Sequence, residues 1–241
     1  MVAANGLATM ATAMKDVRYY YQWVYSALHP LLGDRVLEIG PGYGALADIM
    51  LANKKTYFAI DSDLTVIRNL NERFPQNGKN FFCGNVDDQP WQDVIKSQKV
   101  DTILSMNVLE HVEDDVNHLR QLAKCVPGGR IIVMVPAMRC LYGSLDREAG
   151  HFRRYNKRDL KVALDKASLI PTSVRYFNGV GVAAWWAASK LFKFRIDGQE
   201  TQASIRFNDA LIVPMSRLVD PLLSPFFGQS LIASVSIPVS F

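Results

Sequence analysis

The sequence predicts an α/β fold in which a doubly wound, mostly parallel sheet of seven strands is flanked by helices. Short apolar runs alternate with helical stretches over the first half of the chain, which is typical of parallel strands joined by helical crossovers. A glycine-rich turn follows the first run, and the pattern changes after Pro136. The expected parts are an N-terminal helical region over the binding site (1–34), a core (35–178 and 230–241), and an inserted helical cover before the last strand (179–229).

Five of the strands are expected in the first half of the chain. They are short, apolar and bounded by Gly, Asp, Asn or Pro, as buried parallel strands are. These runs are Arg35–Ile39, Thr56–Ile60, Asn80–Cys83, Val100–Met106 and Arg130–Val135. The helices expected between them are Ala45–Asn53, Leu64–Phe74, Gln89–Lys96 and Val116–Cys125.

The second half of the chain predicts a different arrangement. A polar, aromatic loop covers Ala137–Tyr155, and a helix follows at Lys157–Ala167 with Asn156 as its N-cap. Two further strands are expected at Pro171–Phe177 and Ser230–Ile237. The roughly fifty residues between these strands are too many for a bare connection, so we expect helices there that cover the ligand crevice.

Composition narrows the class of protein. The 241 residues are 49% hydrophobic and 21% charged, with a net charge of +4. This charge suits an anionic substrate but is too small for a nucleic-acid binder. The three cysteines and four histidines lack zinc-site spacing, so no metal site is expected. With no signal peptide expected at the N-terminus and no apolar run near the roughly 20 residues that span a bilayer, we expect a cytoplasmic protein without stable membrane insertion. A homodimer is compatible with the sequence.

The sharpest motif runs from Glu38 to Gly44, with the sequence EIGPGYG. It follows a strand and opens a helix, where glycines let the backbone turn tightly and approach a ligand. A nicotinamide dinucleotide could also bind such a loop, because Gly42–Ala47 fits G-x-G-x-x-A and Asp61 lies about 20 residues further on. The Glu38 carboxylate, however, suits a cationic ligand and is unfavourable beside a pyrophosphate.

This segment resembles motif I, E/D-x-G-x-G-x-G, of the class I S-adenosylmethionine (SAM)-dependent methyltransferases, which have a Rossmann-like fold. Further landmarks of the family follow in order: Asp61 ends the second strand, Gly84-Asn85-Val86-Asp87 follows the third, and Asn107–Val112 (NVLEHV) follows the fourth. The match covers residues 33–136 and is far more specific than the glycine loop alone.

The resemblance implies SAM as the cofactor and assigns its contacts. Glu38 would bind the amino group, Asp61 and Ser62 the ribose, Asn85 and Val86 the adenine, and Asn107 the methionine part, with Gly40, Gly42 and Gly44 along the ligand. Many relatives have Asp where this chain has Asn85, so Asp87 is an alternative adenine contact. The implied activity is methyl transfer to an O, N or C atom of a small molecule.

The acceptor side is expected around Asn107–His111 and a second segment, LYGSLD…GHFRRY, between Leu141 and Tyr155. The second segment resembles a poorly characterised subgroup of these enzymes that is often encoded with glycosyltransferases. An oxygen acceptor must lose a proton, which favours a histidine. We predict His151 as the base with Asp146 as its orienter, and His111 as a further catalytic candidate. The alternative is that His151 and the neighbouring arginines only hold the loop between Leu141 and Tyr155 in place. In the same way, Glu110 and His111 would only support the loop after the fourth strand.

Substrate contacts are predicted for Arg153 and Arg154, which could clamp an anionic group, although adjacent arginines rarely point the same way and one is expected in a structural ion pair. Tyr142 is a further candidate. Near the N-terminus, Tyr21 and Trp23 fall on different faces of a helix, so at most one of them reaches the site; Tyr21 is the substrate-binding candidate.

Three other functions compete with this interpretation. A nicotinamide-dependent oxidoreductase is disfavoured by Glu38 and by the lack of a Tyr-x-x-x-Lys dyad after the fourth strand. A non-catalytic SAM-binding module has little reason to keep the polar loop around His151. A methyltransferase for a lipid-linked, membrane-associated substrate is suggested by the apolar cover at Phe177–Leu191.

Overall fold

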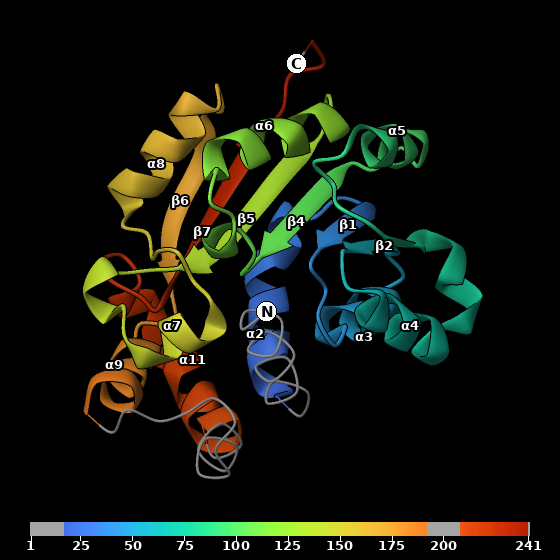
Figure 1. The fold of residues 1–241 in the computed structure, drawn as a ribbon. Coiled ribbons are helices and arrows are strands. Elements are labelled where there is room, and N and C mark those ends of the chain that lie inside the picture. The colour runs from blue at the N-terminus through green and yellow to red at the C-terminus, as the bar shows by residue number, and fades with distance from the viewer. Residues whose placement is uncertain (1–16, 192–207, 241) are drawn as a thin grey trace.

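A single sheet dominates the computed structural model, which describes residues 17–191 and 208–240 (Figure 1). Its seven strands have the order β3-β2-β1-β4-β5-β7-β6. They are β1 (Arg35–Ile39), β2 (Thr56–Asp61), β3 (Phe81–Cys83), β4 (Thr102–Met106), β5 (Arg130–Pro136), β6 (Pro171–Phe177) and β7 (Ser230–Ser236). Strands β1 to β5 are parallel, and β7 is antiparallel to both β5 and β6. The predicted doubly wound, mostly parallel sheet of seven strands is confirmed.

The helices predicted at 45–53, 64–74, 89–96, 116–125 and 157–167 lie close to those bounds, and the structure contains further helices. The α-helices are α2 (Tyr19–Leu28), α3 (Ala45–Ala52), α4 (Leu64–Arg73), α5 (Gln89–Ser97), α6 (Asp115–Cys125), α7 (Ser144–Ala149), α8 (Lys157–Lys166), α9 (Gly181–Trp186) and α11 (Val213–Leu223). The short 3-10 helices are η1 (His29–Leu31), η2 (Pro75–Asn80), η3 (Leu109–His111) and η4 (Arg139–Leu141). Two π-helical turns are η5 (Ala187–Leu191) and η6 (Asn208–Ile212).

One helix, α7, falls in a segment predicted as loop. Its capping explains why it forms: the Asp146 carboxylate accepts a hydrogen bond from the Gly143 amide at 2.9 Å, and Gly150 ends the helix with a φ of 78°. Its six residues are too few to show a helical period in the sequence.

Two apolar layers enclose the sheet (Figure 1). In β5, Ile131, Val133 and Val135 pack into one layer with α5, α6 and α8, while Ile132 and Met134 pack into the other with α2, α3 and α4. Alternate residues of a strand point to opposite faces, so a continuous apolar run supplies both layers. The sheet is therefore buried on both faces, so the ligand-binding site is expected at the ends of its strands.

The segment between β6 and β7 contains α9 and α11 among its described residues; 192–207 lie outside them. It holds the N-terminal helix in place through Asp209, whose carboxylate accepts hydrogen bonds of 2.7–3.0 Å from the amides of Arg18, Tyr19 and Tyr20. Across 17–191 and 208–240, every helix is too short or too polar to span a bilayer.

Candidate active site

The glycine loop connects β1 to α3 in a conformation that requires glycine. Gly40, Gly42 and Gly44 have φ values of 65°, 55° and 69°. A Cβ at Gly40 would lie 2.7 Å from Val108 Cγ2 in the loop after β4, and one at Gly44 would lie 2.4 Å from Leu70 Cδ2 of α4. The loop is thus packed tightly between its neighbours, with its backbone close to the end of β4.

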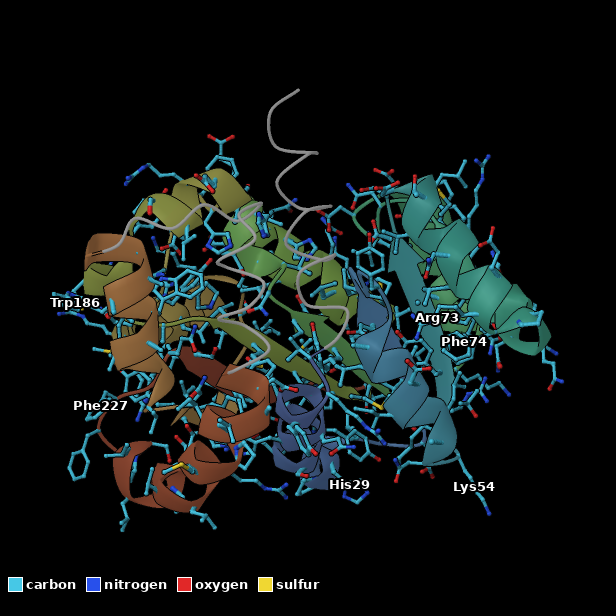
Figure 2. The ribbon with its side chains drawn as sticks, turned by 90° about the horizontal axis from the view of Figure 1, so that it is seen from below. His29, Lys54, Arg73, Phe74, Trp186 and Phe227 are labelled. Carbon is cyan, nitrogen blue, oxygen red and sulfur yellow. The ribbon has the colours of Figure 1, made fainter. Side chains whose placement is uncertain are left out.

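Arg73 fixes the same loop from α4 (Figure 2). Its guanidinium donates to the carbonyl of Tyr43 and pairs with the carboxylate of Asp48 on α3. The loop, α3 and α4 therefore form one connected unit.

Glu38 lies at the end of β1 and is 2% exposed. The Tyr57 hydroxyl donates a 2.5 Å hydrogen bond to its Oε2. Burial raises the pKa of Glu38 to about 7; the Tyr57 bond opposes this shift and the charge of Asp61 adds to it. A buried carboxylate of this kind is stabilised in its ionised form by a cationic partner.

Of the two aromatic candidates on α2, Trp23 is buried and packs on Phe177, with ring centroids 4.4 Å apart. Tyr21 is partly exposed, and its pKa is raised by burial and by the charges of Tyr20 and Glu38. Tyr21 is thus near enough to Glu38 for their charges to interact, and its contact with a substrate stays a prediction.

The ends of β1, β2 and β3 meet at one edge. The Gly40 amide donates to the Ile60 carbonyl at 3.0 Å and the Gly84 amide to the Asp61 carbonyl at 2.9 Å. The Asp61 carboxylate is half-buried and accepts a 2.9 Å bond from the amide of Asp63, and burial raises its pKa.

The residues after β2 and β3 differ in exposure. Ser62 and Asn85 are exposed, whereas Val86 is buried in the core and its side chain cannot line an open site. The Asp87 carboxylate accepts a hydrogen bond from His118 Nδ1 at 2.8 Å, and its role as an alternative adenine contact stays a prediction.

After β4, Asn107 is exposed and adopts a φ of 53°. The η3 turn that follows carries Glu110, whose side chain is fully buried, and His111, which is half-buried. Burial raises the pKa of Glu110 to about 8, and burial together with the neighbouring His151 lowers that of His111 to about 4.

The predicted pairing of His151 with Asp146 is present in the structure. His151 Nδ1 donates to Asp146 Oδ1 at 2.9 Å, and Arg154 Nε donates to the same oxygen at 2.7 Å. Burial would raise the pKa of Asp146, but the His151 bond and the charge of Arg154 outweigh it and the pKa is lowered. His151 Nε2 lies 3.9 Å from Glu110 Oε1, and the His111 and His151 ring centroids are 4.7 Å apart.

Comparison with known proteins identifies the family. The family model described as a methyltransferase domain matches residues 15–173. The chain belongs to this methyltransferase family. A SAM-dependent methyltransferase of Mycolicibacterium smegmatis is 26% identical over 168 residues, and one of Mycobacterium tuberculosis is 30% identical over 127 residues. These matches cover 68% and 50% of the chain but only 63% and 44% of the relatives' lengths.

Solved structures agree on the fold of this methyltransferase. A methyltransferase in complex with the Haloferax volcanii Trm112 activator has a TM-score of 0.61 at 19% identity, covering 98% of this chain and 96% of that one. Phosphoethanolamine N-methyltransferase 2 of Haemonchus contortus, bound to SAM, has a TM-score of 0.60 at 13% identity, covering 97% of this chain and 57% of that one.

The observed residues fit SAM, the cofactor that the sequence motifs predict. SAM carries a cationic amino group, and the buried carboxylate of Glu38 is a group that such a cation stabilises. Membership of a methyltransferase family disfavours the alternative of a nicotinamide-dependent oxidoreductase. The individual cofactor contacts of Glu38, Asp61, Ser62, Asn85 and Asn107 stay predictions.

The side chains of Arg153 and Arg154 have different protein partners. Arg154 is buried against Asp146, donates to the Ala137 carbonyl at 3.0 Å and stacks on Trp185. Arg153 instead pairs with Asp115 at 3.0 Å. Arg154 thus forms the predicted structural ion pair, and the substrate contacts of the two arginines, which line one cavity, stay predictions.

Tyr142 contacts the backbone of the loop between Ala137 and Tyr155 that carries His151, here called the histidine loop. Its hydroxyl donates to the His151 carbonyl at 2.8 Å. This contact is a loop-holding role, and the prediction that Tyr142 also meets a substrate stays open.

Sequence reasoning missed one grouping. The fold brings His111 and His151 together with Glu110, so that one ligand atom of each lies within 4.8 Å of the others. These side chains come from segments about forty residues apart, and their spacing along the chain carried no signal.

Proposed function

We propose that this SAM-dependent methyltransferase methylates a hydroxyl oxygen of a small molecule bound beside Glu110, His111 and His151. The observation that carries the proposal is the His151–Asp146 pair, which leaves Nε2 of a buried, oriented imidazole near the end of β4. The glycine loop lies next to the same strand end, since Val108 would touch any side chain at Gly40. Methyl donor and acceptor would therefore meet at this edge.

The chemistry follows from this arrangement. SAM supplies an electrophilic methyl group on its sulfonium. A lone pair of the acceptor oxygen forms the new O–C bond while the C–S bond breaks and its electrons remain on sulfur. Nε2 of His151 accepts the hydroxyl proton, and Asp146 stabilises the resulting imidazolium. Alignment of oxygen, methyl and sulfur by the protein supplies much of the rate.

The acceptor class is tested by screening hydroxyl-bearing metabolites, including glycosides, for transfer of labelled methyl from SAM. The His151→Ala variant is expected to lower turnover about 10²–10⁴-fold while the dissociation constant for SAM stays within about twofold. His29→Ala is the matched control, because that histidine is exposed on η1. Loss of SAM binding in His151→Ala would show a structural role and contradict the proposal.

A lipid-linked acceptor is a second candidate, supported by the exposed apolar face of the cover. Leu218, Leu222 and Phe226 are 79%, 74% and 77% exposed on and just after α11. Flotation of the protein with liposomes separates this candidate from a water-soluble acceptor.

A further inference from the structure

A carboxylate and two imidazoles converge at the acceptor side of the site. Glu110 and His111 come from η3, and His151 follows α7. One ligand atom from each lies within 4.8 Å of the other two. The Glu110 side chain is 1% exposed and the His151 side chain 10% exposed, so water competes little for this position.

Each imidazole has one nitrogen occupied by a partner outside the cluster. His151 Nδ1 donates to Asp146, and His111 hydrogen-bonds to the backbone of Gly150. A donated N–H on one nitrogen leaves the other with its lone pair free to bind a cation. Metal-binding histidines have this arrangement, with an outer carboxylate or carbonyl that sets the tautomer and the ring orientation.

Glu110 supplies the independent observation. Neither carboxylate oxygen accepts a hydrogen bond from another residue of the described chain. Arg154 is near enough for its charge to act on Glu110, but its own hydrogen bonds go to Asp146 and Ala137. Buried carboxylates are usually paired, hydrogen-bonded or bound to a metal, and among the described residues the approach of Glu110 is to His151 Nε2 of the same cluster, at 3.9 Å and beyond hydrogen-bond distance.

We propose that Glu110, His111 and His151 bind a divalent transition-metal ion of the Mn²⁺, Fe²⁺, Co²⁺ and Zn²⁺ class. Two imidazoles and one carboxylate suit these ions better than Mg²⁺ or Ca²⁺, which prefer oxygen ligands. With bonds of about 2.0–2.2 Å, ligand atoms in a tetrahedral set lie about 3.3–3.6 Å from one another, so the three side chains must move together around the ion. Three protein ligands leave coordination positions open.

The inference deepens the proposed function, on which its catalytic use rests. An open position would take the acceptor oxygen, and the ion would lower the pKa of the hydroxyl so that its proton leaves to water. His151 is then a ligand and not the proton acceptor, and Asp146 becomes the outer carboxylate that orients it. The O–C bond still forms as the C–S bond breaks, and no oxidation state changes.

Metal uptake by the chelator-treated full-length protein tests the site without any acceptor. Mn²⁺, Co²⁺ and Zn²⁺ are titrated by calorimetry, and Co²⁺ binding is also followed by its visible d–d absorption. Uptake is expected in the wild type and is expected to be lost in Glu110→Gln and His111→Ala. Asp146→Asn, which removes the charge of the outer partner of His151 and also weakens the ion pair with Arg154, is expected to weaken binding about 10–100-fold. Circular dichroism checks that each variant is folded.

His118→Ala is the matched control. His118 is also buried and its Nδ1 also contacts an aspartate, Asp87, but it lies outside the cluster, so uptake should match the wild type. Absence of uptake in the wild type, or uptake that survives in folded Glu110→Gln, would overturn the site. Methyl transfer by a protein that takes up no metal would overturn it too while leaving the proposed function intact, with His151 as the base.

Discussion

Burial changes the acidity of the Glu38 side chain, the predicted partner of the SAM amino group. Burial raises its pKa to about 7, so in the free enzyme the carboxyl is ionised above neutral pH and protonated below it. The groups that act on it are the Tyr57 hydroxyl, the Asp61 carboxylate and the partly buried Tyr21. The predicted contact with the cationic amino group of SAM requires the ionised form, so we expect the affinity for SAM to follow this titration.

We therefore expect the affinity for SAM to rise with pH and to level off above about pH 7. Well below the pKa, affinity should fall by up to about tenfold per pH unit, because the carboxyl must first release its proton. Glu38→Gln should weaken binding and flatten the profile, whereas Asp34→Asn, a change at an exposed acid paired with Lys55, should leave it unchanged. Calorimetric titration of SAM between about pH 6 and pH 8 measures this, and a flat wild-type profile would contradict it.

At the scale of elements, α2 depends on a residue from the far end of the chain. Asp209 is 6% exposed and satisfies three amides at the start of α2, at Arg18, Tyr19 and Tyr20. The first amides of a helix have no partner within it, and a carboxylate there also interacts favourably with the helix dipole.

Asp209→Ala is expected to lower the free energy of unfolding by about 2 kcal/mol, at the upper end of the range for a lost N-cap. Asp209→Asn keeps one acceptor oxygen and should lose less. Urea unfolding monitored by tryptophan fluorescence reports the change, since Trp23 lies on α2. Equal stability of Asp209→Ala and the wild type would show that the cap contributes nothing.

The elements that sequence could predict are those with strong local patterns. The buried strands and the helices between them are confirmed to within a few residues because each has its own apolar period. The position of β7 between β5 and β6 was not predicted, because it depends on pairing between residues about a hundred positions apart, such as Arg130 and Ser236. The short helix α7 was missed for lack of length.

At the scale of the molecule, the predicted SAM contacts come from the ends of several strands, so ligand binding should stabilise the whole sheet. At a SAM concentration of about 100 times its dissociation constant, the free energy of unfolding is expected to rise by about 2.7 kcal/mol. Asp61→Ala should reduce this gain at the same SAM concentration, since its affinity would be lower. Denaturant unfolding with and without SAM measures both. An undiminished gain in Asp61→Ala would remove Asp61 from the cofactor site.

The two halves of the site differed in how far the sequence revealed them. For the cofactor half, the sequence offers contiguous motifs directly after strands, as in Glu38–Gly44, and the structure places these motifs at the strand ends while their ligand contacts stay predictions. The acceptor half could be predicted only in part: the His151–Asp146 pair is local, but its approach to Glu110 and His111 depends on packing between distant segments. Residue types alone could not show this.

The bridge between Ala137 and Tyr155 bears on how such an enzyme can change its substrate. The Met138 amide donates to the Tyr155 carbonyl and the Tyr155 amide to the Pro136 carbonyl, both at 2.9 Å. The two ends of the histidine loop are thus joined at the distance of neighbouring strands, roughly 5 Å. The residues between Ala137 and Tyr155 therefore form a loop whose two ends are hydrogen-bonded to each other next to the end of β5. Loops of other length and composition could be grafted between these two residues to redirect the acceptor while the SAM half stays as it is.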